Sequence, residues 1–462
     1  MFKLSLATAG VSAALLCIVS PASAQNLAPS TTIIWNAPDD KAKPAAPATA
    51  APAPVVESAA CASCATGNPG IDFSNKATGN WGGSRDDLAA KGITFDANLT
   101  QFYQGVNSGG RDENYFYGGH LDYYLNVDGE KAGLMKGSFI QLHAEQIYGQ
   151  SANRASGALI PVSMTQVFPN ADGNDIALTG IKYTQFLSEN FAVFGGKLNT
   201  IDSWTQQYAA GRGIDTFMNM NFCFPMTYAR TIPYSTWGAG FAVLKDKEVV
   251  FTFAAMDTAN TPTSTGFENF FQNGVTMMAM GTLPVEFNGL KGHQSIGGSY
   301  STGSYFSIDR NSYFNPIDGT IIAGGAKVAG SWSLCYSFDQ ALFADGCDCK
   351  RTWGIFGNLG VCDANPSPIG WAGTIGIGGA SPISSRHTDN FGVGYFYTNI
   401  NNDLKDFAPR RFPLRDEQGL ELFYNVAVTP WCHITPDFQY VLPGREQFDT
   451  AFLFGLRMKI DF

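Results

Sequence analysis

The chain has 462 residues, of which only 15% are charged, and its formal net charge is −10. The acidic balance argues against a nucleic-acid partner, because nucleic acids select basic surfaces. Charged residues are scarcer than the roughly 25% of a typical soluble protein, whereas glycine (51), phenylalanine (35) and tyrosine (18) are abundant. This composition suits a transmembrane β-barrel, in which alternation dilutes the apolar residues; a large secreted β-protein is the alternative.

Residues 1–24 read as a secretory signal peptide. Lys3 supplies a short positive region, residues 4–20 are apolar or small, and residues 22–24 form a small-x-small cleavage site. After this segment the chain contains no run of about 18 apolar residues, so we expect no transmembrane helix. The mature chain is therefore predicted to act outside the cytoplasm.

Residues 25–77 form a leader for which we predict no fold of its own. The proline- and alanine-rich composition of residues 37–60 is typical of an extended spacer, here in the periplasm. Cys61 and Cys64 form a C-x-x-C pair at its end. A local or intermolecular disulfide is favoured over a redox role, because no βαβ pattern surrounds the pair.

Of the nine cysteines, Cys17 lies in the signal peptide, which leaves eight in the mature chain. An even number outside the cytoplasm favours disulfide bonds, whose pairing the sequence leaves open. Four of them fall in one predicted strand–loop–strand region: Cys335, Cys347, Cys349 and Cys362. Loop disulfides are favoured over a zinc site there, because the C-x-C spacing is too tight for zinc. We expect neither a metal nor a cofactor.

A short helix is predicted over residues 78–92. Ser84 is a candidate N-cap, and Gly92 favours termination of the helix. A helix of about two turns needs a surface to pack on. We expect it to lie at the periplasmic side of the barrel, which begins at Ile93.

From residue 93 onward, short segments alternate between apolar and polar residues, the pattern of half-buried strands. In residues 119–128, for example, Leu121 and Tyr123 alternate with His120 and Asp122. We count about sixteen such segments: 93–103, 119–128, 137–148, 176–187, 191–200, 235–244, 248–256, 275–287, 292–302, 325–337, 351–360, 370–379, 390–400, 418–429, 431–442 and 450–462. The sequence thus predicts an all-β fold, an antiparallel transmembrane barrel over residues 93–462.

The last segment, residues 450–462, has the most regular alternation. Its apolar positions are Phe452, Phe454, Leu456, Met458, Ile460 and Phe462. Arg457 and Lys459 lie between them and are predicted to face the lumen, because lipid requires an apolar face. We expect this strand to close the barrel by pairing with residues 93–103.

The predicted joins between strands alternate between short and long. Residues 188–190, 245–247 and 429–431 read as tight turns. The long joins are residues 103–118, 149–175, 200–234, 257–274, 302–324 and 400–417. This alternation is typical of outer-membrane barrels, and an even number of strands places both ends of the barrel in the periplasm.

Two stretches have recognisable motifs. Residues 80–93 read NWGGSRDDLAAKGI, and residues 421–443 begin with ELFYNVAVTPWCHITPDFQ. They resemble the W-G-G-x-R-x-x-L-x-x-x-G-I and E-x-F-Y-N-x-x-x-T-P-W-x-x-x-x-P-D-x-Q motifs of carbohydrate-selective outer-membrane porins, the OprB family. The resemblance extends from about residue 78 to residue 462 and is loosest over residues 200–320.

The resemblance implies a 16-stranded barrel in the outer membrane of a Gram-negative bacterium. It also implies passive uptake of glucose and other mono- or small oligosaccharides, with the lipid bilayer and the sugars as partners. By similarity to outer-membrane proteins, Phe462 is expected to be read by the barrel-insertion machinery. The sequence leaves open which sugar is preferred, and whether the protein is a monomer or a trimer.

A sugar pore needs hydrogen-bond donors and acceptors on its wall, and aromatic faces for the sugar ring. A charge on the lipid face would cost about 2–4 kcal/mol at mid-depth, so charged strand residues are assigned to the lumen. The candidate pore-lining residues are Arg85, Asp96, His120, Asp122, Glu145, Lys197, Lys327, Glu421 and Arg457. Solvation of the lumen is the alternative role for the strand residues, and a tie between helix and wall is the alternative for Arg85.

The loop at residues 199–208 supplies two more candidates, Asp202 and Trp204. It follows a predicted strand and mixes an aromatic side chain with amides, a composition that suits a constriction loop folded into the lumen. The alternative is a surface loop with a packed tryptophan.

Two other functions are alternatives to a sugar pore. A general porin, or a pore selective for another small solute, is the main rival. An enzymatic barrel would need a serine and a histidine at the lipid-facing wall, and the chain contains no G-x-S-x-G motif. The chain is therefore not predicted to be an enzyme.

Overall fold

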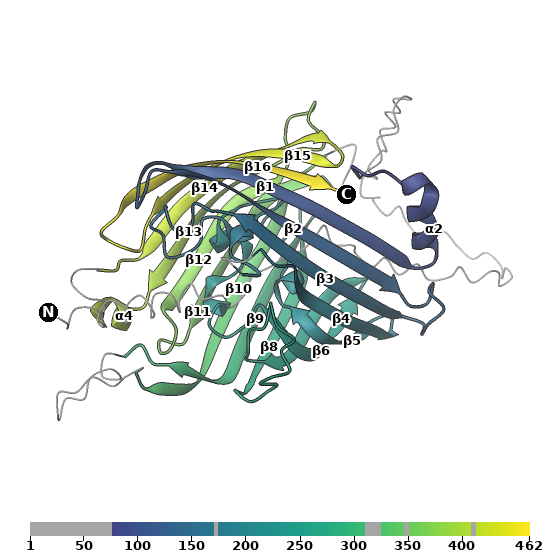
Figure 1. The fold of residues 1–462 in the computed structure, drawn as a ribbon, viewed down its shortest axis with the longest axis horizontal. Helices are drawn as coiled ribbons and strands as arrows, with labels where there is room; N and C mark the ends of the chain where they lie inside the picture. The colour runs from purple at the N-terminus through teal and green to yellow at the C-terminus, as the bar shows by residue number, and fades with distance from the viewer. Residues whose placement is uncertain (1–75, 171–173, 310–324, 346–350, 408–412) are drawn as a thin grey trace, which may run out of the picture.

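The structure, a computed structural model, describes residues 76–170, 174–309, 325–345, 351–407 and 413–462. Its strands form one closed antiparallel barrel in which each strand pairs with its neighbours in the sequence (Figure 1). The strands are β1 (Ile93–Gly110), β2 (Tyr115–Asp128), β3 (Ser138–Gly149), β4 (Ala177–Ser188), β5 (Phe191–Asn199), β6 (Ser235–Lys245), β7 (Glu248–Asp257), β8 (Val275–Phe287), β9 (Leu290–Phe306), β10 (Lys327–Ala344), β11 (Thr352–Cys362), β12 (Ile369–Ala380), β13 (Asn390–Ile400), β14 (Glu417–Thr429), β15 (Cys432–Leu442) and β16 (Asp449–Asp461). The predicted fold class is confirmed.

The last strand closes the barrel as predicted. In β16, Asp461 pairs with Asn98 of β1, and the register continues to Asp449 opposite Gly110. Figure 1 shows the two strands side by side, one at each end of the colour scale. The two strands can pair over this length because β1 extends beyond the predicted residue 103.

The two ends of the barrel differ in their connections. The short-turn end holds the start of β1, the end of β16 and turns such as residues 189–190 and 246–247. The long-loop end holds the connections that leave odd-numbered strands. The join predicted over residues 103–118 is not a long loop, because β1 and β2 extend as a hairpin and leave only residues 111–114 between them.

The N-terminal helix consists of η1 (Trp81–Gly83) and α2 (Ser84–Ala90) and lies beside the short-turn end (Figure 1). Gly83 is the N-cap, so the predicted cap, Ser84, is instead the first helical residue. Gly92, with φ of 81°, follows the helix end as predicted. In the described part of the chain, no helix is long and apolar enough to cross a membrane.

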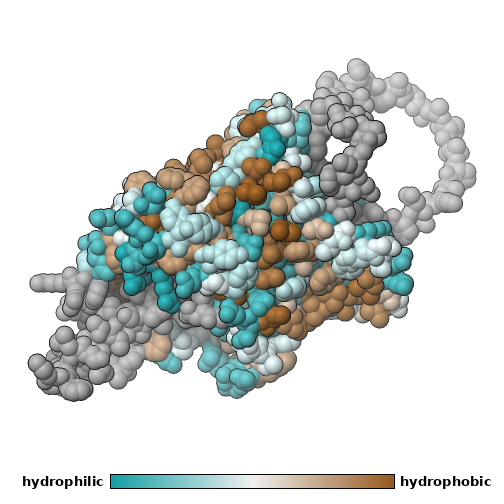
Figure 2. Space-filling view, turned by 45° about the horizontal axis from the view of Figure 1, so that its top comes forward, coloured by the Kyte–Doolittle hydropathy of each residue, from teal (hydrophilic) through white to brown (hydrophobic). Residues whose placement is uncertain are grey.

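The outer wall of the barrel is apolar. On β16, Phe452, Phe454 and Leu456 are exposed, whereas Leu453 and Arg457 are buried. Figure 2 shows hydrophobic residues gathered across the middle of the visible wall and hydrophilic ones nearer its ends. The alternation read from the sequence therefore assigns the lipid and inner faces of this strand correctly.

Two long connections fold into the barrel, and we call them the first inner loop (residues 150–176) and the second inner loop (residues 200–234). Most of their described residues between 152 and 234 are buried. They contain short helices: η2 (Met164–Gln166), η3 (Ile201–Ser203), α3 (Met220–Cys223) and η4 (Met226–Tyr228). Figure 1 shows these turns inside the ring of strands, whereas α4 (Asn402–Phe407) lies at the long-loop end.

The second inner loop contacts inward residues on several sides of the barrel. Phe217 packs against Phe356 of β11 and Phe423 of β14, with ring centroids 5.4 and 4.9 Å apart. On another part of the wall, Thr231 hydrogen-bonds with Ser299 of β9 at 2.6 Å. A segment with partners on such distant strands must cross the interior, so the two loops narrow the barrel.

The expected disulfides are not found among the described cysteines. Cys223, Cys335, Cys362 and Cys432 are all free thiols. Cys335 pairs opposite Gly360 and Cys362 opposite Ser333, so the two cysteines on these neighbouring strands are offset from one another in the register. The remaining candidates lie outside the described residues: Cys61, Cys64, Cys347 and Cys349. The predicted signal peptide and most of the leader also lie outside them.

Candidate functional site

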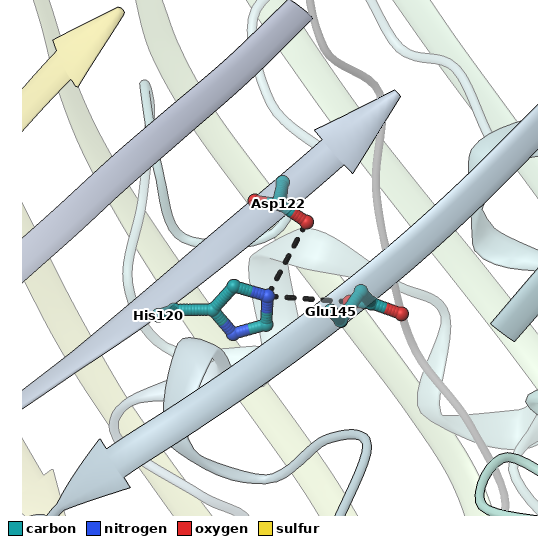
Figure 3. Close-up of side chains that lie close together, drawn as sticks. All are labelled: His120, Asp122 and Glu145. Carbon is teal, nitrogen blue, oxygen red and sulfur yellow. Dashed lines mark hydrogen bonds and ion pairs between the residues drawn. The ribbon is translucent and has the colours of Figure 1, made fainter. Parts of the chain in front are cut away.

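The inner wall carries a buried group of charged side chains. His120 and Asp122 come from β2, and Glu145 lies beside them on β3 (Figure 3). Nε2 of His120 lies 3.3 Å from Oδ1 of Asp122 and 3.2 Å from Oε1 of Glu145. These predicted residues are thus brought together on the inner wall, but they are buried against protein and do not face open lumen.

The second inner loop completes this group with Arg212 and Asp202. The Arg212 guanidinium contacts the carboxylate of Asp122 and lies 3.1 Å from Oε1 of Glu145. Asp202 lies 3.1 Å from Nδ1 of His143, the neighbour of Glu145 on the inner face of β3. We call the six side chains the charge cluster: His120, Asp122, His143, Glu145, Asp202 and Arg212.

The charge cluster contains a set of possible metal ligands. The ligand atoms of His120, Asp122 and Glu145 lie within 4.8 Å of one another. The guanidinium of Arg212 contacts both of these carboxylates. Arg212 therefore supplies, from the protein itself, the positive charge that a metal ion would otherwise provide there.

Glu421 and Arg457 hold another part of the second inner loop. The Glu421 carboxylate accepts hydrogen bonds from the backbone N–H groups of Met218 and Asn219, the latter at 2.9 Å. Arg457 donates to the carbonyls of Gly213, at 2.6 Å, and Thr216, at 2.8 Å. Both residues were predicted to line a sugar path, and the structure assigns their charged groups to backbone atoms of the loop.

The first inner loop is held in the same manner by residues that the sequence did not single out. Oε2 of Glu417 accepts a 2.6 Å hydrogen bond from the N–H of Leu159, and Oε1 accepts a 2.9 Å bond from Ile160. Gln439 donates to the carbonyl of Val162 at 2.9 Å. The alternation of apolar and polar residues predicts that Glu417 and Gln439 face inward. It does not predict their partners in the loop, which lie 257 and 277 residues away in the sequence.

Trp204 lies in the apolar interior of the second inner loop. Its side chain is 4% exposed and packs edge-on against Phe224 and Tyr228, with ring centroids 6.4 and 6.1 Å apart. The loop is folded inward, as the constriction hypothesis requires. The indole itself packs against protein, as in the alternative interpretation, although the loop is not at the surface.

Three further candidates lie apart from these anchors. Arg85 lies over the ring of Trp81 at 4.4 Å, within the N-terminal helix. Asp96 forms a 2.7 Å ion pair with Lys76 at the short-turn end. Lys197 donates to the carbonyls of Leu178 and Ser264. The contacts of Asp96 and Lys197 suit a structural tie, whereas the contact of Arg85 stays within the N-terminal helix.

Lys327 was assigned to the lumen incorrectly. It pairs with Phe306 at the long-loop end and is exposed, with its ammonium group 5.5 Å from the centre of that ring. The register shifts between Ala329 and Ser331, where β9 has one residue more than β10, and the alternation of β10 is broken there because Gly330 and Ser331 are both buried. Counting back from the inward Ser331 therefore gives the wrong face for Lys327.

A small cavity lies beside the charge cluster. Its lining includes Gln141, Lys182, Asn199 and Asp202. An amide carbonyl and a carboxylate accept hydrogen bonds, whereas an ammonium group and amide N–H groups donate them. The cavity thus offers both partners that a sugar hydroxyl needs when it leaves water.

Residues 112–462 match the sequence model of a family described as carbohydrate-selective porin, OprB family. Porin B of Pseudomonas aeruginosa is 23% identical over 435 residues, which cover 83% of this chain and 90% of that protein. The high-pH structure of Pseudomonas putida OprB matches with a TM-score of 0.72 at 21% identity, and the low-pH structure with 0.54 at 17%. Both matches cover 84% of this chain and 99% of the solved one.

The structural matches support the closed barrel fold, and the family match extends from the loop between β1 and β2 to the last residue. The match therefore includes both inner loops and the wall residues that anchor them. The chain belongs to the OprB family of carbohydrate-selective porins and is a sugar porin of the Gram-negative outer membrane.

Proposed function

We propose that mono- and small oligosaccharides diffuse passively through a constriction formed by the two inner loops. The supporting observation is that buried wall charges on several strands hold these loops inside the barrel. A fixed loop keeps the opening narrow. In a narrow polar opening, hydrogen bonds between the sugar and the wall replace those between the sugar and water. No energy source and no catalytic step are part of this proposal.

We assign two roles to residues of the inner wall and the second inner loop. Asp122, Glu145, Glu421 and Arg457 act as anchors, because their charged groups are engaged by the second inner loop or by its Arg212. Sugar contacts are assigned to partly exposed polar groups of the cavity lining, namely Gln141 and Lys182, together with Asp202. Such contacts must be weak, because a tightly bound sugar would not leave the pore.

Single-channel recording tests the proposal. The purified protein in a planar bilayer should conduct ions, and the current should fall as glucose or a small oligosaccharide is added to the bath. Gln141→Ala and Lys182→Gln should weaken the block severalfold, whereas Lys327→Gln at the outer rim should leave it unchanged. A current that no sugar in a broad panel reduces would favour a general porin.

The orientation of the barrel is part of the same proposal. We assign the short-turn end, with its N-terminal helix, to the periplasm, since short turns face that side in outer-membrane barrels. Recognition of the last strand by the barrel-insertion machinery stays a prediction. So does the oligomeric state, for which both a monomer and a trimer remain open.

A further inference from the structure

Trp237 of β6 points away from the barrel interior. The next residue, Gly238, pairs with Met256 of β7, which is 2% exposed and belongs to the apolar cluster that includes the second inner loop. Successive residues of a strand face opposite sides, so Trp237 lies on the outward face. The outward face is confirmed on the neighbouring strands, where Ala255, next to Met256, pairs with the exposed Met277.

The β7–β8 loop, residues 258–274, folds back against this outward face. Nε1 of Trp237 donates a 2.7 Å hydrogen bond to the carbonyl of Thr265. The indole also stacks on the ring of Phe267, with ring centroids 4.6 Å apart. The two inner loops fold into the barrel, whereas this loop covers part of the lipid-facing side of the wall at the long-loop end.

Two buried charges hold the β7–β8 loop in place. The carboxylate of Asp257, at the end of β7, accepts hydrogen bonds from the backbone N–H groups of Ala259, at 3.0 Å, and Phe271, at 2.6 Å. The ammonium group of Lys197 donates to the carbonyl of Ser264 at 2.8 Å. The loop is thus held near both of its ends and in its middle, so binding at its surface costs little further loss of conformational freedom.

Three phenylalanines of this loop are exposed. Phe267, Phe270 and Phe271 have exposed fractions of 58%, 45% and 37%. Their rings contact one another in chain order, with centroids 5.8 and 4.6 Å apart. Glu268 is the only charged residue in the sequence of the loop, whose other polar residues carry neutral hydroxyl and amide groups. An exposed apolar cluster of this kind marks a surface that contacts lipid or protein.

The cluster is continuous with the lipid-facing wall, because Phe267 stacks on the outward Trp237. Aromatic rings beside neutral polar groups favour the boundary between the acyl chains and the headgroups of a bilayer. We propose that the β7–β8 loop is a membrane anchor, in which Phe267, Phe270 and Phe271 insert into the lipid boundary at the long-loop end. Such an anchor opposes movement of the barrel along the membrane normal. It depends neither on the sugar pathway nor on which end of the barrel faces the periplasm.

Fluorescence quenching of Phe270→Trp tests the anchor. The wild type and the variant are reconstituted in bilayers, and the emission that the variant adds is obtained as the difference between them. A lipid brominated in the upper part of its acyl chains should quench this added emission, whereas the water-soluble quencher acrylamide should have little effect. Quenching by acrylamide without quenching by the brominated lipid would show that the loop lies in water, and it would overturn the proposal.

Phe306→Trp is the matched control. Phe306 is 46% exposed, close to the value for Phe270. It lies beyond the ends of β7 and β8, because Ser301, earlier in β9, already pairs with Thr276 near the start of β8. The emission that this variant adds should therefore be quenched by acrylamide and not by the brominated lipid.

A second measurement requires no variant. The wild-type porin is placed in lipid nanodiscs that hold one porin each, and hydroxyl radicals oxidise its water-exposed side chains. Phe267 should be oxidised severalfold less than Phe306, although Phe267 is the more exposed of the two in the protein alone. Equal oxidation of the two residues would contradict the anchor. Protection of Phe267 that appears only when each disc holds several porins would show that a second copy covers the loop, and it would also overturn the proposal.

Discussion

The guanidinium of Arg457 in the last strand donates a 2.6 Å hydrogen bond to the backbone carbonyl of Gly213, 244 residues earlier in the chain. Glu417 and Glu421 of β14 make comparable contacts with backbone N–H groups of the two inner loops. A buried charge needs fixed partners, and a loop inside a barrel needs partners for its backbone groups. The inner-wall charges satisfy both needs at once.

Replacing Arg457 with glutamine should loosen the second inner loop. The change removes hydrogen bonds from a charged donor to Gly213 and Thr216, and one such bond contributes about 1.5–3 kcal/mol. We expect a higher single-channel conductance and a sugar block weakened by about tenfold or more, which corresponds to about 1.4 kcal/mol. Lys327→Gln, which also removes one positive charge, should behave as the wild type; equal effects in both variants would indicate that charge alone matters.

Glu417→Gln should release the first inner loop. The carboxylate accepts from three backbone N–H groups, those of Leu159, Ile160 and Gly444. A glutamine amide has one oxygen, so at least one buried N–H group loses its acceptor, at a cost of about 1–3 kcal/mol. Amide exchange of peptides around residue 160 should accelerate about tenfold, and the ion conductance should rise.

The control for this variant is Glu248→Gln. Glu248 begins β7 and forms a 3.1 Å ion pair with Lys291, in which both side chains are exposed. Exposed ion pairs contribute little, so exchange in the first inner loop should be unchanged. Normal protection of residues 158–162 in Glu417→Gln would show that the loop does not depend on this carboxylate.

The strands could be predicted well from the sequence because each strand has lipid on one side and the barrel interior on the other. Residues such as Phe452 and Arg457 alternate since lipid and interior demand opposite polarity, and this demand acts on each strand separately. The prediction failed at Lys327, because a register shift against β9 breaks the alternation of β10 between Ala329 and Ser331. It also could not find the partner of Arg212, because the fold alone brings residues 122 and 212 together.

Trp204→Ala should disrupt the second inner loop through packing. The indole is 4% exposed beside Phe224 and Tyr228, and truncation of a buried tryptophan costs about 3–5 kcal/mol. We expect faster amide exchange across residues 201–228 and a weaker sugar block together. Trp204→Phe should retain most of both. If Trp204→Ala abolished the block while loop exchange stayed slow, the indole would be a sugar contact instead.

Acid should open the turn at residues 381–389 through Asp389. Burial opposes ionisation of this carboxyl, but the hydrogen bonds from Arg386 and from the N–H of Ala427 outweigh it and hold its pKa below the usual range. A group with a lowered folded-state pKa stabilises the structure above its unfolded pKa of about 3.9 and loses this contribution as the pH falls further. We therefore expect the turn to be stable at neutral pH and to open below about pH 4.

Cleavage of the turn by an acid-active protease, followed from pH 5 to pH 2.5, measures this opening. Asp389→Asn should be cleaved already at pH 5, because the neutral amide cannot pair with the Arg386 guanidinium, whose Nε and Nη2 lie 2.7 and 2.9 Å from the carboxylate. Asp246→Asn, in the exposed turn between β6 and β7, serves as the control and should follow the wild type. Resistance of Asp389→Asn at pH 5 would show that other contacts, such as the strand pairing of β12 with β13, hold this turn closed.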